Sequence, residues 1–105
     1  MKIRARLGAT LGNPLGSLEI GGSTYKLKQV ESDGDLGGNA GVAHNHPPTI
    51  LIVKGVGETV LWHEVLESFQ LEACCTIPHE VVATFASFTL QVMKQLGVRM
   101  EMEYD

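Results

Sequence analysis

The stretch TILIVKGVGETVLWHEVLESF, residues 49–69, contains two different apolar periods in succession and decides the fold. Its first part, residues 49–54, is short and rich in β-branched side chains, and the two prolines before it bar a helix there. From Glu58 onward the apolar residues recur at helical steps instead. The stretch therefore predicts a buried strand that is followed, after Gly55 and Gly57, by a helix.

The helix that begins near Glu58 has an apolar face and a polar side, and an acidic residue in its first turn is favourable. The apolar face is marked by Val60 or Leu61, Val65, Leu66 and Phe69. We expect His63, Glu64 and Glu67 to be rotated away from the centre of that face.

The chain before residue 49 has the character of strands and loops. Residues 18–20 and 24–30 read as a hairpin, because the Gly21-Gly22 pair between them can supply positive φ angles. Residues 31–48 are rich in Gly, Asp and Asn and have no apolar period, which predicts a long surface loop.

A second helix is predicted within IPHEVVATFASFTLQVMKQLG, residues 77–97, where Pro78 suits the first turn and Gly97 a C-terminal stop. Its recurring apolar residues are Val81, Phe85, Phe88, Val92 and Leu96. We expect Phe69, Phe85 and Phe88 to form part of the core. The tail from residue 98 alternates as a final strand would.

These elements predict an α+β fold, in which a small antiparallel or mixed sheet packs on a two-helix pair that carries the site. A chain of 105 residues is long enough for one domain with one modest core, so we treat residues 1–105 as a single domain. A formal charge of −4 and a pI near 5.5 disfavour a nucleic-acid partner.

The chain shows neither a secretory signal nor an apolar run of the roughly 20 residues that cross a bilayer. We therefore expect a cytoplasmic protein without a membrane partner. Cys74 and Cys75 are adjacent, so a bond between them would strain the peptide that joins them, and reduced thiols are expected.

The first predicted helix carries a pair of candidate ligands for one metal ion. Residues four apart lie above one another on a helix, so His63 and Glu67 can approach one point in space. Glu64 lies roughly 100° further around the helix, where it can contact a water without binding the metal. The H-E-x-x-H signature of zinc peptidases has the same arrangement, but Glu67 stands here in place of its second histidine.

Zinc requires a third ligand, and His79 is the best candidate. It stands in the first turn of the second helix, which a short connector makes an antiparallel neighbour of the first. Glu80 is a weaker alternative. His44 and His46, in AHNHPP, fit an exposed loop better than a ligand pair, and Cys74 and Cys75 are left outside the expected site.

The run from Gly22 to Gly97, about three quarters of the chain, resembles a set of small, mostly phage- and prophage-encoded proteins that are similar to compact zinc peptidases of the gluzincin type. The matching positions are Thr59, Leu61, His63, Glu64, Glu67, Pro78, His79, Gln91 and Val92. The resemblance implies a metal-binding fold of the peptidase type, located in the host cytosol where the chain is phage-encoded.

These expectations lead to a metal-dependent hydrolase that acts on a peptide or protein. Zinc held by His63, Glu67 and His79 would lower the pKa of a water, and Glu64 would take its proton before attack on a carbonyl. Iron(II) is an alternative metal, because two histidines and one carboxylate also describe a class of iron centre. The alternative function is a non-catalytic phage or host interaction protein with a structural metal or none. Oligomeric state is left open.

Overall fold

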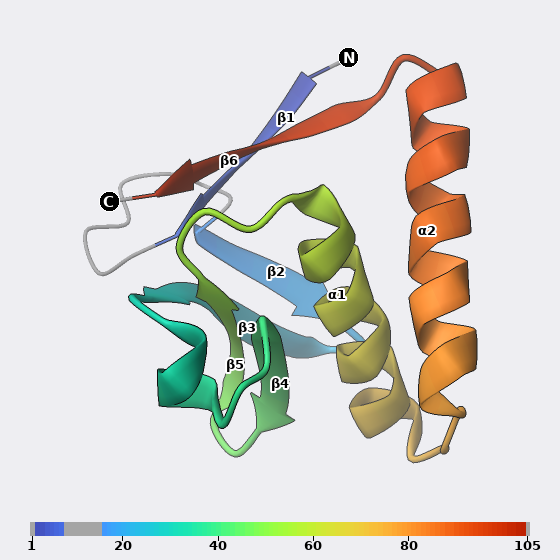
Figure 1. Ribbon diagram of the computed structural model, residues 1–105. Coiled ribbons are helices and arrows are strands. Elements are labelled where there is room, and N and C mark those ends of the chain that lie inside the picture. The colour runs from blue at the N-terminus through green and yellow to red at the C-terminus, as the bar shows by residue number, and fades with distance from the viewer. Residues whose placement is uncertain (1, 8–15, 105) are drawn as a thin grey trace.

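The computed structural model describes residues 2–7 and 16–104, and the surroundings of side chains for residues 16–98 (Figure 1). In chain order its elements are β1 (Lys2–Leu7), β2 (Ser17–Ile20), β3 (Ser23–Val30), the 3-10 helix η2 (Asp33–Leu36), β4 (Gly41–Asn45), β5 (Pro48–Val53), α1 (Glu58–Ala73), α2 (His79–Gln95) and β6 (Arg99–Tyr104). Within this part of the chain, neither helix has the length and apolar character needed to cross a membrane.

The larger sheet is four-stranded and mixed, with the strand order β2-β3-β5-β4. Strands β3 and β5 are parallel, whereas β2 and β4 pair antiparallel with the inner strands. The predicted hairpin of β2 and β3 is confirmed, and it turns at Gly21 and Gly22, whose φ angles of 60° and 91° suit glycine. The strand predicted at residues 49–54 is confirmed as β5.

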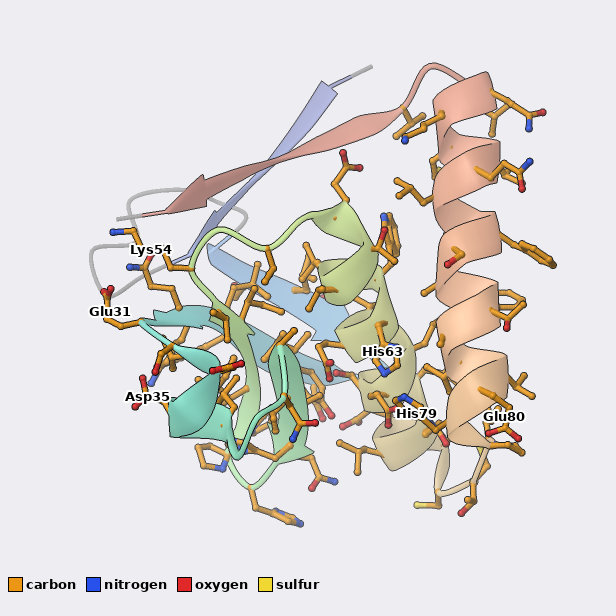
Figure 2. All side chains as sticks on the ribbon, viewed as in Figure 1. Glu31, Asp35, Lys54, His63, His79 and Glu80 are labelled. Carbon is orange, nitrogen blue, oxygen red and sulfur yellow. The ribbon has the colours of Figure 1, made fainter. Side chains whose placement is uncertain are left out.

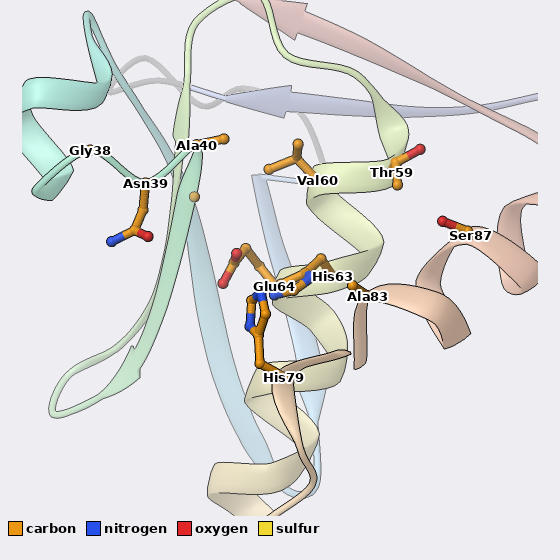
Figure 3. Close-up of a pocket in the computed structure, with 11 residues that line it drawn as sticks. Gly38, Asn39, Ala40, Thr59, Val60, His63, Glu64, His79, Ala83 and Ser87 are labelled. Atoms are coloured by element: carbon orange, nitrogen blue, oxygen red, sulfur yellow. The ribbon is translucent and has the colours of Figure 1, made fainter. Parts of the chain in front are cut away.

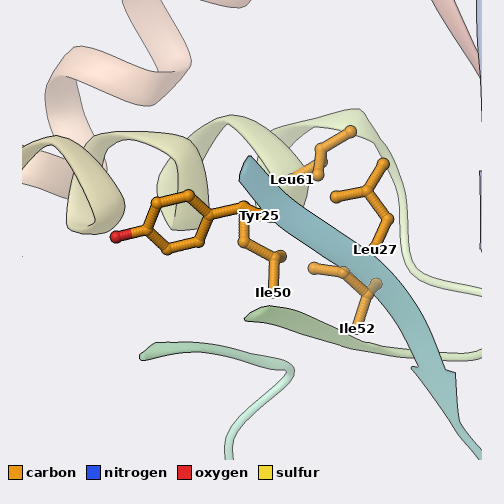
Figure 4. Close-up of a cluster of buried hydrophobic side chains, with 5 residues drawn as sticks. All are labelled: Tyr25, Leu27, Ile50, Ile52 and Leu61. Atoms are coloured by element: carbon orange, nitrogen blue, oxygen red, sulfur yellow. The ribbon is translucent and has the colours of Figure 1, made fainter. Parts of the chain in front are cut away.

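The core lies between this sheet and α1 (Figure 4). Alternate residues of the two inner strands point toward the helix, as a period of two requires, while Lys26 and Lys28 point to solvent. The fully buried side chains of this cluster are Tyr25, Leu27, Ile50, Ile52 and Leu61, each at 0% exposure.

The two helices run antiparallel, and α2 lies on the far side of α1 from the sheet (Figure 1). The molecule is therefore layered as sheet, α1 and α2, which confirms the predicted α+β fold with a mixed sheet and a helix pair. Strands β1 and β6 form a separate two-stranded parallel sheet. The final strand was expected from the sequence, but β1 was not.

The prediction of a long surface loop over residues 31–48 was wrong. This segment contains η2 and the strand β4, whose sequence GVAHN has little strand propensity of its own. β4 exists because it pairs along the edge of β5, with Gly41 opposite Ile52 and Asn45 opposite Pro48. A contact of this kind lies outside the information in a local sequence window.

The prediction that Phe69, Phe85 and Phe88 belong to the core was also wrong. All three are exposed, whereas Val82 and Ala86 are the buried residues of α2. The helix carries two apolar stripes, and the one that contains Val82 and Ala86 faces α1. The stripe that contains Phe85 and Phe88 is turned outward.

Candidate metal centre

The site is built on α1, whose limits follow from its local sequence. Gly57 precedes the helix in an extended conformation, Glu58 occupies the favourable first turn, and Cys74 ends the helix with a left-handed φ of 53°. This start places His63 in the second turn and Glu67 one turn later.

His63 and Glu67 approach each other as their spacing predicts. The distance from His63 Nε2 to Glu67 Oε1 is 3.4 Å, and the side chains are 18% and 32% exposed. Both are therefore partly shielded from water and still reachable by an ion.

His79 joins them from the first residue of α2 (Figure 2). Its Nδ1 lies 4.0 Å from Glu67 Oε1, and its ring centroid lies 4.9 Å from that of His63. The side chain is 77% exposed, so its ring is free to turn. The expected third residue is thus adjacent to the first two.

Gln70 fixes the geometry between the two helices, and its role was missed in the sequence. Its Nε2 donates to Glu67 Oε2 at 3.1 Å, and its Oε1 accepts from the amide of Ile77 at 2.6 Å. One buried amide therefore orients the carboxylate and also holds the chain two residues before His79. The only indication in the sequence was a glutamine three residues after Glu67, which is on the same side of the helix.

The donor atoms of His63, Glu67 and His79 lie close enough together that they could hold one metal ion. One atom from each of His63, Glu67 and His79 lies within 4.8 Å of the others. Bonds of about 2.0–2.2 Å place the donors of a tetrahedral zinc roughly 3.3–3.6 Å apart. The spacing of His63 and Glu67 already meets this requirement, and the 4.0 Å between His79 Nδ1 and Glu67 Oε1 exceeds it only slightly.

Glu64 is buried at 5% exposure, although helical periodicity predicts that it is rotated away from the apolar face. Strand β4 causes the burial, because a Cβ on Gly41 would lie only 2.9 Å from Glu64 Cγ and 3.0 Å from Val60 Cγ1. Glycine is what allows so close an approach. Loss of water raises the pKa of Glu64 to about 7, and the negative charge of Glu67 adds to the shift.

A cavity of about 350 Å³ opens beside these residues, between β4, α1 and the start of α2 (Figure 3). His63, Glu64 and His79 line one wall, and the loop before β4 lines another. The remaining lining residues are Gly38, Asn39, Ala40, Gly41, Thr59, Val60, Ala83 and Ser87. Two of the three candidate metal ligands, His63 and His79, therefore face a common space with the carboxylate of Glu64.

The other candidate ligands lie outside this group. His44 is in β4, where its Nδ1 lies 3.0 Å from the carbonyl oxygen of Pro47, and His46 is exposed in the turn that follows. Cys74 and Cys75 are free and exposed in the connector. Glu80 is exposed and does not belong to the His63, Glu67 and His79 group.

Comparison of the chain with protein-family models, with curated proteins and with solved structures finds no match. The resemblance to compact gluzincin-type peptidases therefore remains a prediction that rests on the residues quoted above.

Proposed function

We propose that this protein is a metal-dependent hydrolase of peptidase type. The observation that carries the proposal is the convergence of His63, Glu67 and His79 to within 4.8 Å, beside a cavity that Glu64 also lines. Two imidazoles and one carboxylate form the ligand set of a class of catalytic zinc sites, in which the fourth position stays open for water or substrate.

Each residue has a distinct role in this proposal. His63, Glu67 and His79 would hold the cation, which supplies Lewis acidity and makes a water more acidic when bound. Glu64, one residue after His63, accepts a proton from the attacking water at a carboxylate oxygen and returns it to the departing amine. Gln70 keeps the Glu67 carboxylate oriented through its hydrogen bond.

The position of β4 supports a peptide as the substrate. Among the described strands, β4 is an edge of the four-stranded sheet and pairs with β5 alone. Its first residue and the loop before it line the cavity. An extended peptide could pair with this edge through main-chain hydrogen bonds and pass the metal ligands.

The first test is metal content. Purified, untagged protein is dialysed against zinc and then metal-free buffer, and we expect one zinc per chain by elemental analysis. His63→Ala and His79→Ala should each lose the metal, while Glu80→Gln, a change of charge on the residue next to His79, should retain it. Zinc retained by both histidine variants would overturn the proposed ligand set, and selective retention of iron(II) would change the metal.

The second test is hydrolysis of a library of internally quenched peptides by the zinc-loaded protein. Glu64→Gln should keep one zinc and lose at least about 100-fold in rate, the usual contribution of a general base. Equal rates for Glu64→Gln and the unchanged protein would remove Glu64 from the chemistry. A protein that binds zinc tightly and cleaves no peptide in the library would support the structural-metal alternative instead.

A further inference from the structure

The outward face of α2 is an unusually apolar surface. It consists of an outer stripe of five residues spaced three and four apart, namely Val81, Phe85, Phe88, Val92 and Leu96. Their exposures lie between 48% and 68%. The opposite side of the helix already packs on α1 through Val82 and Ala86.

The outer stripe is large enough to serve as an interface. Together with Phe69 of α1, its phenylalanines leave roughly 300 Å² exposed, taking about 200 Å² for one such side chain. The valines and the leucine bring the patch toward the roughly 600 Å² per partner found at the lower end of stable interfaces. Monomeric proteins rarely leave so much contiguous apolar surface in water.

One end of the stripe has a hollow and the other end has a protruding side chain. The hollow has a volume of about 190 Å³ and lies between the C-terminal half of α1 and the start of α2. Its lining is Leu66, Phe69, Ile77, Val81, Val82 and Phe85. At the far end, Leu96 is the most exposed of the large apolar side chains described, at 68%.

We propose that a second copy of this chain covers the outer stripe, with the two α2 helices packed antiparallel about a two-fold axis near Phe88. This arrangement places Val81 opposite Leu96 and Phe85 opposite Val92 of the other copy. Leu96 of each copy then enters the hollow beside Val81 of the other. A two-fold axis forms both contacts at once, and the assembly closes as a dimer.

The charge distribution favours a second copy of this chain. In an antiparallel two-fold pair, the flank of the stripe meets the same flank of the other copy, so a charge near the two-fold axis would lie beside its own copy. The exposed residues along this flank are the uncharged Thr84, Gln91 and Gln95, together with Glu80 at its beginning, beside Val81 and Thr84. The proposed antiparallel arrangement places Glu80 near Leu96 of the other copy and far from that copy's own Glu80. Two copies, each with a formal charge of −4, can thus meet along this flank without placing like charges opposite one another.

The test is the mass of the full chain by sedimentation equilibrium over a range of concentrations. We expect a reversible monomer–dimer equilibrium. Phe88→Glu should weaken dimerisation about 100-fold or more, because it buries two carboxylates beside each other at the two-fold axis. Lys94→Gln lowers the charge by the same amount, but its position on α2 is roughly 160° around the helix from the centre of the outer stripe. This variant should dimerise like the unchanged protein.

Leu96→Ser provides a second variant at an exposed position beyond the end of α2, and we expect a roughly tenfold weaker dimer from loss of its contact with the hollow. Circular dichroism shows whether each variant is folded. A chain that stays monomeric at high concentration overturns the proposal. A dimer that persists in both Phe88→Glu and Leu96→Ser also overturns the proposal. An open assembly that grows beyond two copies overturns it as well.

Discussion

At the scale of single residues, Gly41 has a large effect on the site because it has no side chain. It allows β4 to lie so close to α1 that Glu64 loses nearly all contact with water. The protein therefore holds a carboxylate at the cavity wall by backbone proximity. Because residue 41 has no Cβ, the backbone of β4 can pack directly against the Glu64 side chain.

Gly41→Ala should lower the free energy of unfolding by about 1–3 kcal/mol, the usual cost of overpacking. Its Cβ would meet Glu64 Cγ at 2.9 Å, so either the strand or the glutamate has to move. The matched control is Gly34→Ala, where the added Cβ lies an ordinary 3.5 Å from Ser32 Oγ. Urea unfolding measures both variants, and equal stabilities would contradict the tight approach of β4 to α1.

Some of these residues could be predicted from sequence and others could not. The proximity of His63 and Glu67 follows from helical spacing, and that of His79 follows from a short connector between two helices. The burial of Glu64 depends on β4, which is distant in sequence. Helical periodicity placed Glu64 on the polar side, because the sequence of α1 contains no information about the strand β4 that packs against Glu64 through Gly41.

At the scale of elements, the β2–β3 hairpin is tied to the end of α1 by Glu72. Tyr25 Oη donates to Glu72 Oε2 at 2.6 Å, and Ser23 Oγ donates to Glu72 Oε1 at 2.8 Å. Gly21 lets the hairpin turn approach, because a Cβ there would lie 2.7 Å from Glu72 Cβ. This contact fixes the C-terminal half of α1, and with it Glu67 and Gln70, against the sheet.

The hydrogen bonds donated by Tyr25 and then Ser23 lower the pKa of Glu72. A lowered folded-state pKa contributes stability above the ordinary glutamate value of 4.5, and that stability is lost as the pH falls through the folded-state value. We expect Glu72→Gln to reduce the acid-induced fall in the free energy of unfolding. Glu31→Gln removes the same charge at an exposed position and should leave the fall unchanged.

The opposite end of the pH range tests the same contact. Burial, the hydrogen bond to Glu72 and the charge of Glu72 raise the pKa of Tyr25 to about 12. The stability from this shift is complete below the ordinary value of 10 and is lost as the pH rises toward 12. Unfolding of Tyr25→Phe should be less sensitive to alkali, and an unchanged profile would argue against the contact.

The elements differ in how well their sequences define them. Strand β5 and helix α1 have the periods of a buried strand and an amphipathic helix, and both were predicted. Strand β4 has no such period, and its structure comes from pairing with β5. For α2 the helix was predicted, but its buried side was not, because periodicity identifies apolar stripes without indicating which one faces the protein.

At the scale of the whole molecule, one core between the sheet and α1 supports a second helix that packs mainly against α1. The cluster around Tyr25, Ile50 and Leu61 is fully buried, whereas most of the large apolar side chains of α2 are exposed. Stability should therefore be concentrated in the sheet and α1.

Leu61→Ala should lower the free energy of unfolding by about 2–5 kcal/mol, the cost of a cavity in a packed core. Phe85→Ala, although it removes a larger side chain, should change it by no more than about 1 kcal/mol in dilute, monomeric protein. The reason is that Phe85 is 56% exposed while Leu61 is at 0%. Chemical unfolding of both variants measures the difference, and a reversed order would contradict the layering.

The parallel pairing of β1 with β6 has a consequence for biosynthesis. Lys2 pairs with Arg99 and Leu7 with Tyr104, so the two paired strands are separated in sequence by all the other elements described. During translation β1 leaves the ribosome long before β6 exists. Until β6 has been made, the backbone groups of β1 that pair with it lack that partner, and unpaired strand groups of this kind can be bound by chaperones or neighbouring nascent chains.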